Sequence, residues 1–246
     1  RVGDAIQVLQ RLRDEVNFAS IWSHEETGNA WSFERDKIVA AWCQSHSIQW
    51  HQFPQTGVIR QLPDRNGWSR RWDHCMGQKQ SLAPRSLKPF HEIDPGFLPR
   101  AEDLDLELDP CPGRQRGGRT RALNVLESFL EERGERYRSE MSSPISAVSA
   151  CSRLSPHLAF GSVSMREVAQ ATWTRQKNFR DWPNPQGNAL WRKSLASFNG
   201  RLHWHCHFMQ KLEDQPDLEM RNMHPAYDDL RSSNDEYFNS WARGET

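Results

Sequence analysis

Residues 151–168 read CSRLSPHLAFGSVSMREV, and this stretch decides the fold because two helix starts lie within ten residues of each other. A Ser–Pro pair at 155–156 is typical of a helix cap and first turn. Ser164 with Glu167 three residues later is a capping box. The stretch therefore predicts two consecutive helices joined by a short turn.

The first of these helix starts also suggests a ligand. Free N–H groups and a partial positive charge at a helix N-terminus favour phosphate. Ser152 and Ser155 add hydroxyl donors there. Capping serines are common, so the pattern fits either a phosphate site or two ordinary helix caps.

Helical spacing continues on both sides of this stretch. Leu123, Leu126 and Leu130 fall on one stripe, and Gly134 is a possible stop. Residues 188–212, NALWRKSLASFNGRLHWHCHFMQKL, predict a long helix that is interrupted or bent near Gly200. From residue 119 onward the chain is expected to be all-α.

The N-terminal part reads differently. A helix over 4–13, a strand over 18–23, a helix over 32–47 and a strand over 47–54 form a βαβ unit, which implies a parallel sheet. Two strands do not make a stable open sheet. Either the chain opens inside a domain, or further strands lie later.

Residues 55–118 lack sustained periodicity and are rich in proline, with one short helix expected around SRRWDHCMGQ (69–78). A loop of this length needs a reason, and joining two domains is one. The expected fold class is α/β plus all-α. Its domains are a partial α/β domain over 1–60, an interdomain linker over 61–118 and a helical domain over 119–246.

Composition suggests which kinds of ligand the protein could bind. The 246 residues carry zero formal charge, and eleven tryptophans suggest flat-ligand pockets as well as ordinary core packing. Residues 111–180 hold twelve Lys/Arg against six Asp/Glu, which fits either a polyanion partner or a solvated basic face.

Five scattered cysteines, an odd number without a CxxC pair, favour reduced thiols in a cytoplasmic protein over a disulfide framework or a zinc ribbon. The sequence has no run of about 18 apolar residues, so no membrane span is predicted, and the first residues lack the signal-peptide pattern.

The histidine-rich run RLHWHCHFMQ (201–210) raises the question of a metal site. On a helix, residues two apart point about 200° apart, so the three histidines do not converge on one ion. His203 and His207 could share a face, but no Glu follows His203 as in HExxH, and a third ligand would have to come from elsewhere. A packed aromatic and imidazole face around a ligand or within a core fits better, and no metal is expected.

Four segments resemble the DNA photolyase and cryptochrome family. Residues 137–168 resemble its flavin-binding segment, a tyrosine followed by (T/S)SRLSPYLxxGxxS, and residues 189–212 resemble its WxxELxWRxFY helix. The closing WARGET (241–246) resembles the opening of WxxGxTGxPxxDAxMR, and residues 21–54 resemble the later part of the family's N-terminal domain.

The resemblance implies a partial Rossmann-like antenna domain followed by the first part of a helical FAD-binding domain. It also implies a chain truncated at both ends, which would itself be inactive. The implied cofactors are FAD and, in the longer protein, an antenna chromophore of the folate or flavin type. An iron–sulfur cluster in that longer protein stays open.

Site residues carry over one by one. Residues implied to hold FAD are Tyr137, Cys151 (where threonine is usual), Ser152, Arg153, Leu154, Ser155 and Phe198 (where tryptophan is usual). Arg201, Trp204 and His205 are implied as catalytic, and the same three with Phe208 as DNA-contacting.

Two departures bear on activity. Arg201 stands where photolyases have the glutamate that contacts the pyrimidine dimer, and His205 replaces an arginine. The first puts cyclobutane-dimer repair in doubt, since Arg201 favours a phosphate or an anionic base edge. The second offers a proton donor, as in photolyases of the (6–4) lesion.

The expected function is light-driven repair of pyrimidine dimers by electron transfer from reduced FAD. Damaged DNA would be the partner, its damaged base extruded into the pocket, and the protein a monomer. The alternatives are a cryptochrome-like blue-light photoreceptor without repair activity and a helical interaction protein that has lost flavin.

Overall fold

The computed structural model describes residues 1–89, 93–108, 111–181 and 188–245. Its α-helices and strands, in chain order, are α1 (Ala5–Val16), β1 (Ser20–His24), α2 (Ala30–Ser45), β2 (Gln49–Phe53), α3 (Trp68–Gly77), α4 (Arg119–Glu131), α5 (Tyr137–Glu140), α6 (Ala147–Ala150), α7 (Ser155–Ala159), α8 (Met165–Arg180), α9 (Ala189–Asp214) and α10 (Asp235–Arg243). Short 3₁₀ turns are η1 (Glu102–Leu104), η2 (Arg133–Arg136), η3 (Pro216–Glu219) and η4 (Pro225–Tyr227).

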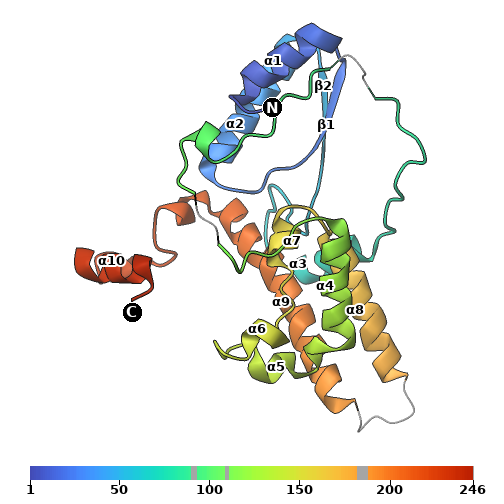
Figure 1. Cartoon of the computed structure of the whole chain (residues 1–246), viewed down its shortest axis with the longest axis vertical. Coiled ribbons are helices and arrows are strands. Elements are labelled where there is room, and N and C mark those ends of the chain that lie inside the picture. Colours follow the sequence, from blue (N-terminus) through green and yellow to red (C-terminus); the bar gives the residue numbers. More distant parts are fainter. Residues whose placement is uncertain (90–92, 109–110, 182–187, 246) are drawn as a thin grey trace.

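A small α/β unit forms the N-terminal part, at the top of Figure 1. β1 and β2 pair in parallel, with Ser20 opposite Gln49 and His24 opposite Phe53. Val39, Trp42, Cys43 and Ile48 form its buried core, against which α1 packs. The parallel βαβ unit predicted from the sequence is therefore confirmed, as a two-stranded sheet within the described residues.

A larger helical unit forms around α3, α4, α8 and α9, in the lower half of Figure 1. Its core is continuous from Trp72 on α3 through Phe129 on α4 and Val168 on α8 to Leu195 on α9, and each of these four side chains is fully buried. The fold is thus mostly helical with a small parallel sheet, which agrees with the predicted α/β plus all-α class at this coarse level.

The short helix expected at 69–78 is present as α3, and it is a core element of the helical unit. Gln210 of α9 binds the segment just before α3: the Ile59 N–H donates to Gln210 Oε1 at 2.7 Å, and Gln210 Nε2 donates to the Ile59 carbonyl at 2.9 Å. The predicted linker also spans 90–92 and 109–110, which lie outside the described residues. Where the domain boundaries run stays a prediction.

Several local expectations were wrong. Leu123 is exposed, and Ala122 and Phe129 are buried in the α4 face together with Leu126 and Leu130. The helix α9 is not interrupted at Gly200, since it is one α-helix from Ala189 to Asp214.

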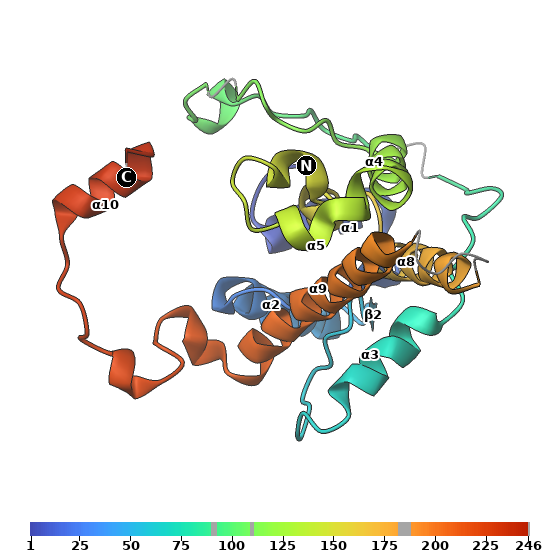
Figure 2. The ribbon, with the colours of Figure 1, turned by 90° about the horizontal axis from the view of Figure 1, so that it is seen from below.

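The helix expected over 32–47 starts earlier, because the side chain of Asn29 caps it by accepting from the Ser32 N–H. Near the C-terminus the structure has a further helix, α10, with Asn234 as its cap. Figures 1 and 2 both show α10 lying apart from the helical unit.

In the described part of the chain, no helix is long and apolar enough to cross a membrane.

Candidate functional site

One face of α9 carries an exposed aromatic strip with a cation on it. The guanidinium carbon of Arg201 lies 4.4 Å from the centre of the Trp204 ring, a cation–π contact. Trp204 also meets Phe208 edge-on at 6.0 Å. Both rings are more than half exposed. The structure therefore brings together Arg201, Trp204 and Phe208, three residues predicted to contact DNA.

His205 follows Trp204 on the same helix. Its Nδ1 lies 3.8 Å from the Cys206 sulfur, and desolvation lowers the pKa of His205 below its ordinary value. Desolvation thus disfavours the protonated form of this imidazole.

Behind this strip lies a buried aromatic cluster. The Tyr137 ring meets Phe129 edge-on at 5.5 Å and Phe198 at 5.7 Å, while Phe129 and Phe198 are 4.6 Å apart. Burial raises the pKa of Tyr137, Cys151 raises it further, and the charge of Arg201 lowers it. Tyr137 thus lies within electrostatic range of both Cys151 and Arg201, one residue from each of the two predicted groups.

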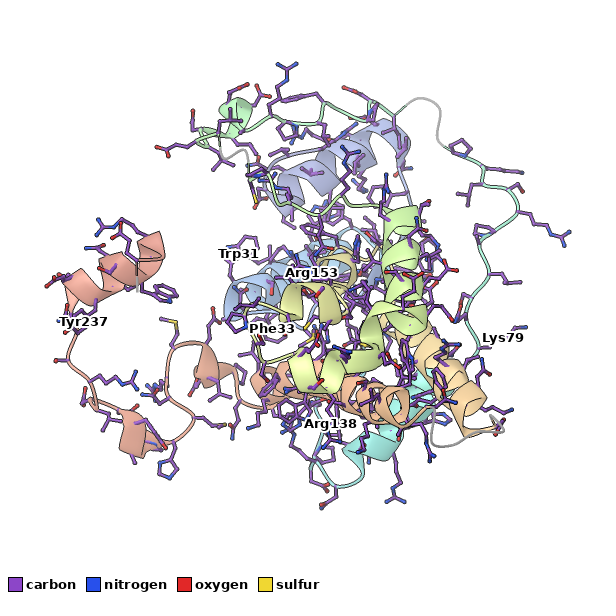
Figure 3. All side chains as sticks on the ribbon, turned by 60° about the horizontal axis from the view of Figure 1, so that its bottom comes forward. Trp31, Phe33, Lys79, Arg138, Arg153 and Tyr237 are labelled. Carbon is purple, nitrogen blue, oxygen red and sulfur yellow. The ribbon has the colours of Figure 1, made fainter. Side chains whose placement is uncertain are left out.

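Residues 151–155 form a tight turn that leads into α7. Arg153 adopts a left-handed backbone with φ of 60°, and its side chain is exposed, while Leu154 is buried as the anchor of the turn. Ser152 is half-buried and Ser155 is exposed. Figure 3 labels Arg153 at this turn. Since α7 has only five residues, the predicted helix dipole is small, and phosphate binding here would depend on side chains.

Arg133 in η2 holds this turn against α4, and no sequence signal pointed to it. Nη1 donates to the carbonyls of Cys151 at 2.6 Å and Ser149 at 3.3 Å, and Nη2 donates to Ser152 at 3.3 Å. On the other side, Nη2 donates to the Val125 carbonyl and Nε to the Ser128 hydroxyl, each at 3.1 Å. The guanidinium therefore joins α4 to the turn through four of its hydrogen bonds and to Ser149 at the end of α6 through the fifth.

Two arginines lie close together at this turn. Burial lowers the pKa of Arg133 and the neighbouring Arg153 lowers it further, while Cys151 and Glu132 raise it. No carboxylate of the described residues forms an ion pair with either arginine. Two cations close together, neither in an ion pair, favour an anionic ligand at this turn.

Ser194 on α9 is a second residue whose role the sequence did not predict. Its hydroxyl donates to the Glu135 carbonyl at 2.6 Å and accepts from the Arg138 N–H at 3.1 Å. This fully buried side chain fixes the backbone on both sides of Tyr137. A serine inside a long apolar helix face is a signal that could have found it, because buried hydroxyls need partners.

Two histidines of α9, His203 and His207, face α3. His203 lies over Trp72 with ring centres 3.8 Å apart, its Nε2 is 3.0 Å from Asp73 Oδ1, and His207 meets Trp68 edge-on at 5.9 Å. The packed aromatic and imidazole face expected from the sequence is thus present. Among the described residues no group of three His, Cys, Asp or Glu side chains could hold a metal ion.

Comparison with known proteins was made at the level of family, sequence and structure. Residues 198–246 match the family model described as the FAD binding domain of DNA photolyase. The chain is 30% identical over 177 residues to a deoxyribodipyrimidine photo-lyase of Streptomyces griseus, covering 72% of this chain and 34% of that protein. A second, from Halobacterium salinarum, is 28% identical over 265 residues, covering 100% of this chain and 52% of that protein.

Solved structures show the same fold. A class III photolyase from Agrobacterium tumefaciens superposes with a TM-score of 0.74 at 22% identity, covering 98% of this chain and 51% of that one. A cryptochrome from Synechocystis sp. PCC6803 gives 0.75 at 15% identity, covering 99% and 52%. An archaeal photolyase from Sulfolobus tokodaii, solved with two FAD molecules, gives 0.61 at 19%, covering 99% and 50%. The chain spans about half the length, or less, of the relatives it matches.

Proposed function

Because the chain belongs to the DNA photolyase and cryptochrome family, we propose that its helical unit holds part of an FAD site and that the protein repairs pyrimidine dimers in DNA with light. The observation that carries this proposal is the pair of neighbouring arginines, Arg133 and Arg153, that meet at the turn 151–155 beside the buried Tyr137 cluster. The family match at residues 198–246 supports it independently.

The residues present fit the two chemical halves of FAD. Arg153, Ser152 and Ser155 offer a guanidinium and two hydroxyls to a diphosphate, which suits the charge-assisted hydrogen bonds that phosphates accept. Tyr137 and Phe198 offer aromatic edges to a flat ring or a ribose. Reduced FAD, when bound, would supply the electron that splits the dimer.

The chain's own residues would then position DNA. Trp204 and Phe208 present exposed ring faces on which an extruded base can stack, and Arg201 beside them can contact a phosphate or a base edge. His205 lies next to Trp204 on the same helix as a proton donor to the lesion, and its lowered pKa means that the donating, protonated form is disfavoured until a negative charge approaches it. On this proposal damaged DNA is the partner, and the working species is a monomer in the cytoplasm.

A blue-light photoreceptor without repair activity is the second candidate, and Arg201 favours it. The resemblance places a dimer-contacting glutamate at that position. The structure has a cation there, stacked on Trp204, which offers no carboxylate to a lesion.

The test is a titration of FAD with protein purified in the dark, followed through quenching of flavin fluorescence. We expect saturable binding that Arg153→Gln weakens about tenfold, since it removes one charge-assisted contact to a phosphate. The matched control is Arg138→Gln, an exposed arginine on α5 (Figure 3), which should leave binding unchanged.

A second assay separates the two candidates. The protein and flavin are illuminated with blue light in the presence of an oligonucleotide that contains a thymine dimer. Recovery of intact thymines supports repair. Light-dependent bleaching of bound flavin without recovery supports the photoreceptor, and absence of flavin binding overturns both.

A further inference from the structure

A second site lies outside all the residues carried over from the family. A cavity of about 380 Å³ opens between the segment that precedes α4, α4 itself and α7. We refer to it as the arginine cavity. It is lined by Gln115, Arg116, Arg121, Val125 and His157.

His157 is the buried wall of the arginine cavity. Its side chain is only 2% exposed, and its Nε2 is fully buried without a hydrogen-bond partner. Within the described residues no other group hydrogen-bonds its ring. A buried polar group left unpaired costs about 1–3 kcal/mol, so an imidazole in this position needs a reason.

The two arginines of the cavity supply the complementary feature. Arg119, between them in sequence, pairs with Glu167 at 2.6 Å. In contrast, neither Arg116 nor Arg121 forms an ion pair with any carboxylate of the described residues. Their guanidinium forks are chemically suited to bidentate binding of phosphate oxygens.

We propose that the arginine cavity binds a phosphate group, with Arg116, Arg121 and the Gln115 amide as donors and His157 as the buried contact. A tetrahedral dianion would compensate both guanidinium charges and give the imidazole a partner. This proposal does not depend on the flavin site, because none of its residues belongs to the turn 151–155 or to the aromatic cluster of Tyr137.

The phosphate has two possible sources, either a free phosphate or nucleotide, or the phosphodiester backbone of DNA. Both present the same oxygens to the arginines. The twelve Lys/Arg against six Asp/Glu over 111–180 would favour either one electrostatically.

The primary test is calorimetric titration of the whole chain with inorganic phosphate at low ionic strength. We expect saturable binding that Arg116→Gln and Arg121→Gln each weaken about tenfold, while Arg138→Gln, outside the cavity, leaves it unchanged. No saturable binding, or binding that both cavity variants leave intact, overturns the proposal.

The role of His157 is read without replacing it, because a change at a buried side chain could unfold the protein. Long-range ¹H–¹⁵N NMR spectra of the wild-type protein should show the ring nitrogens of His157 shifting as phosphate is added. The Arg116→Gln/Arg121→Gln double variant should show no shift at the same phosphate concentration. A ring that does not respond in the wild type counts against the site.

Competition then identifies the source. If inorganic phosphate displaces an undamaged DNA duplex and the two arginine variants weaken both ligands, the cavity contacts the DNA backbone. If the variants weaken phosphate and AMP but leave duplex binding unchanged, the ligand is a free phosphate or nucleotide.

Discussion

At the scale of single residues, Glu167 takes part both in the capping box predicted from the sequence and in an ion pair with Arg119. Its Oε2 accepts from the Ser164 N–H and hydroxyl, both at 2.9 Å, and its Oε1 lies 2.6 Å from Arg119. The pKa of Glu167 is lowered from 4.5 to about 2, and the largest cause is the side-chain hydrogen bond from Arg119. Because the folded-state pKa is depressed, this stabilisation is full above about pH 4.5 and is lost as the pH falls towards 2.

Glu167→Gln should therefore lower the free energy of unfolding at pH 7 by about 1–2 kcal/mol, a value discounted because the arginine partner is exposed to screening solvent. Urea unfolding of both proteins measures this difference. It should shrink steadily between about pH 4.5 and about pH 2. A difference that stays constant over that range would show that the charge on Glu167 is not what stabilises the capping box.

Gly134 is the second residue whose identity the packing dictates. A Cβ there would overlap the Phe129 carbonyl oxygen and lie 3.0 Å from its ring atom Cε2. Gly134→Ala should cost about 1–3 kcal/mol, because the Phe129 ring against Tyr137 and Phe198 has no room to move.

Gly200→Ala is the matched control for this substitution. An added Cβ at Gly200 meets no atom within 4 Å, and the residue lies inside the long helix α9. The alanine should stabilise the protein by about 0.5–1 kcal/mol through helix propensity. Thermal unfolding measures both changes, and equal destabilisation by the two alanines would contradict the close approach at Phe129.

At the scale of elements, one guanidinium determines how the turn 151–155 sits on α4. Arg133→Lys keeps the positive charge but cannot make five hydrogen bonds in a planar fork. We expect a loss of about 2 kcal/mol of stability and, if the turn binds FAD, an affinity that falls with it. Urea unfolding and flavin titration measure the two effects.

Arg133→Gln separates positioning from charge. If lysine restores flavin binding fully while glutamine abolishes it, the charge of Arg133 acts directly, and the positioning role is wrong. If both variants weaken binding alike, the fork that holds the carbonyls of Cys151 and Ser152 is what matters.

The elements that the sequence predicts well are those fixed locally. The capping box at Ser164 is present with both of its hydrogen bonds, and the Ser–Pro start of α7 lies where the pattern placed it. Such caps depend on residues three apart, so one stretch of chain contains all the information. The roles of Arg133 and Ser194 depend on backbone groups brought in by other elements, and no local pattern encodes them.

The same reasoning explains α3. Its position near 69–78 could be predicted, but a proline-rich setting hid its importance. Trp72 is fully buried among side chains of α8 and α9, far away in sequence. Only the folded chain shows that this helix completes the core of the helical unit.

At the scale of the whole molecule, the packing of α3 predicts how the protein behaves when its chain is cut. Residues 79–89 and 93–100 have no regular secondary structure, and Lys79, Arg85 and Arg100 are exposed there. Brief treatment with trypsin should therefore cut in this region first. Since Trp72 and Met76 are buried against the helices that follow, the two pieces should still elute together from a gel-filtration column.

Gln210→Leu tests what holds the pieces together. The wild-type amide donates to the Ile59 carbonyl and, through Oε1, accepts from the Ile59 N–H. Trp68 Nε1 lies 3.3 Å from the same Oε1 atom of Gln210. Leucine fills a similar volume but leaves these backbone groups unpaired, so the cut variant should separate at a lower urea concentration than the cut wild type. Wild-type pieces that separate without denaturant would contradict a core shared between α3 and α9. A cut variant as resistant as the wild type would instead show that apolar packing around Trp72 suffices to hold the pieces.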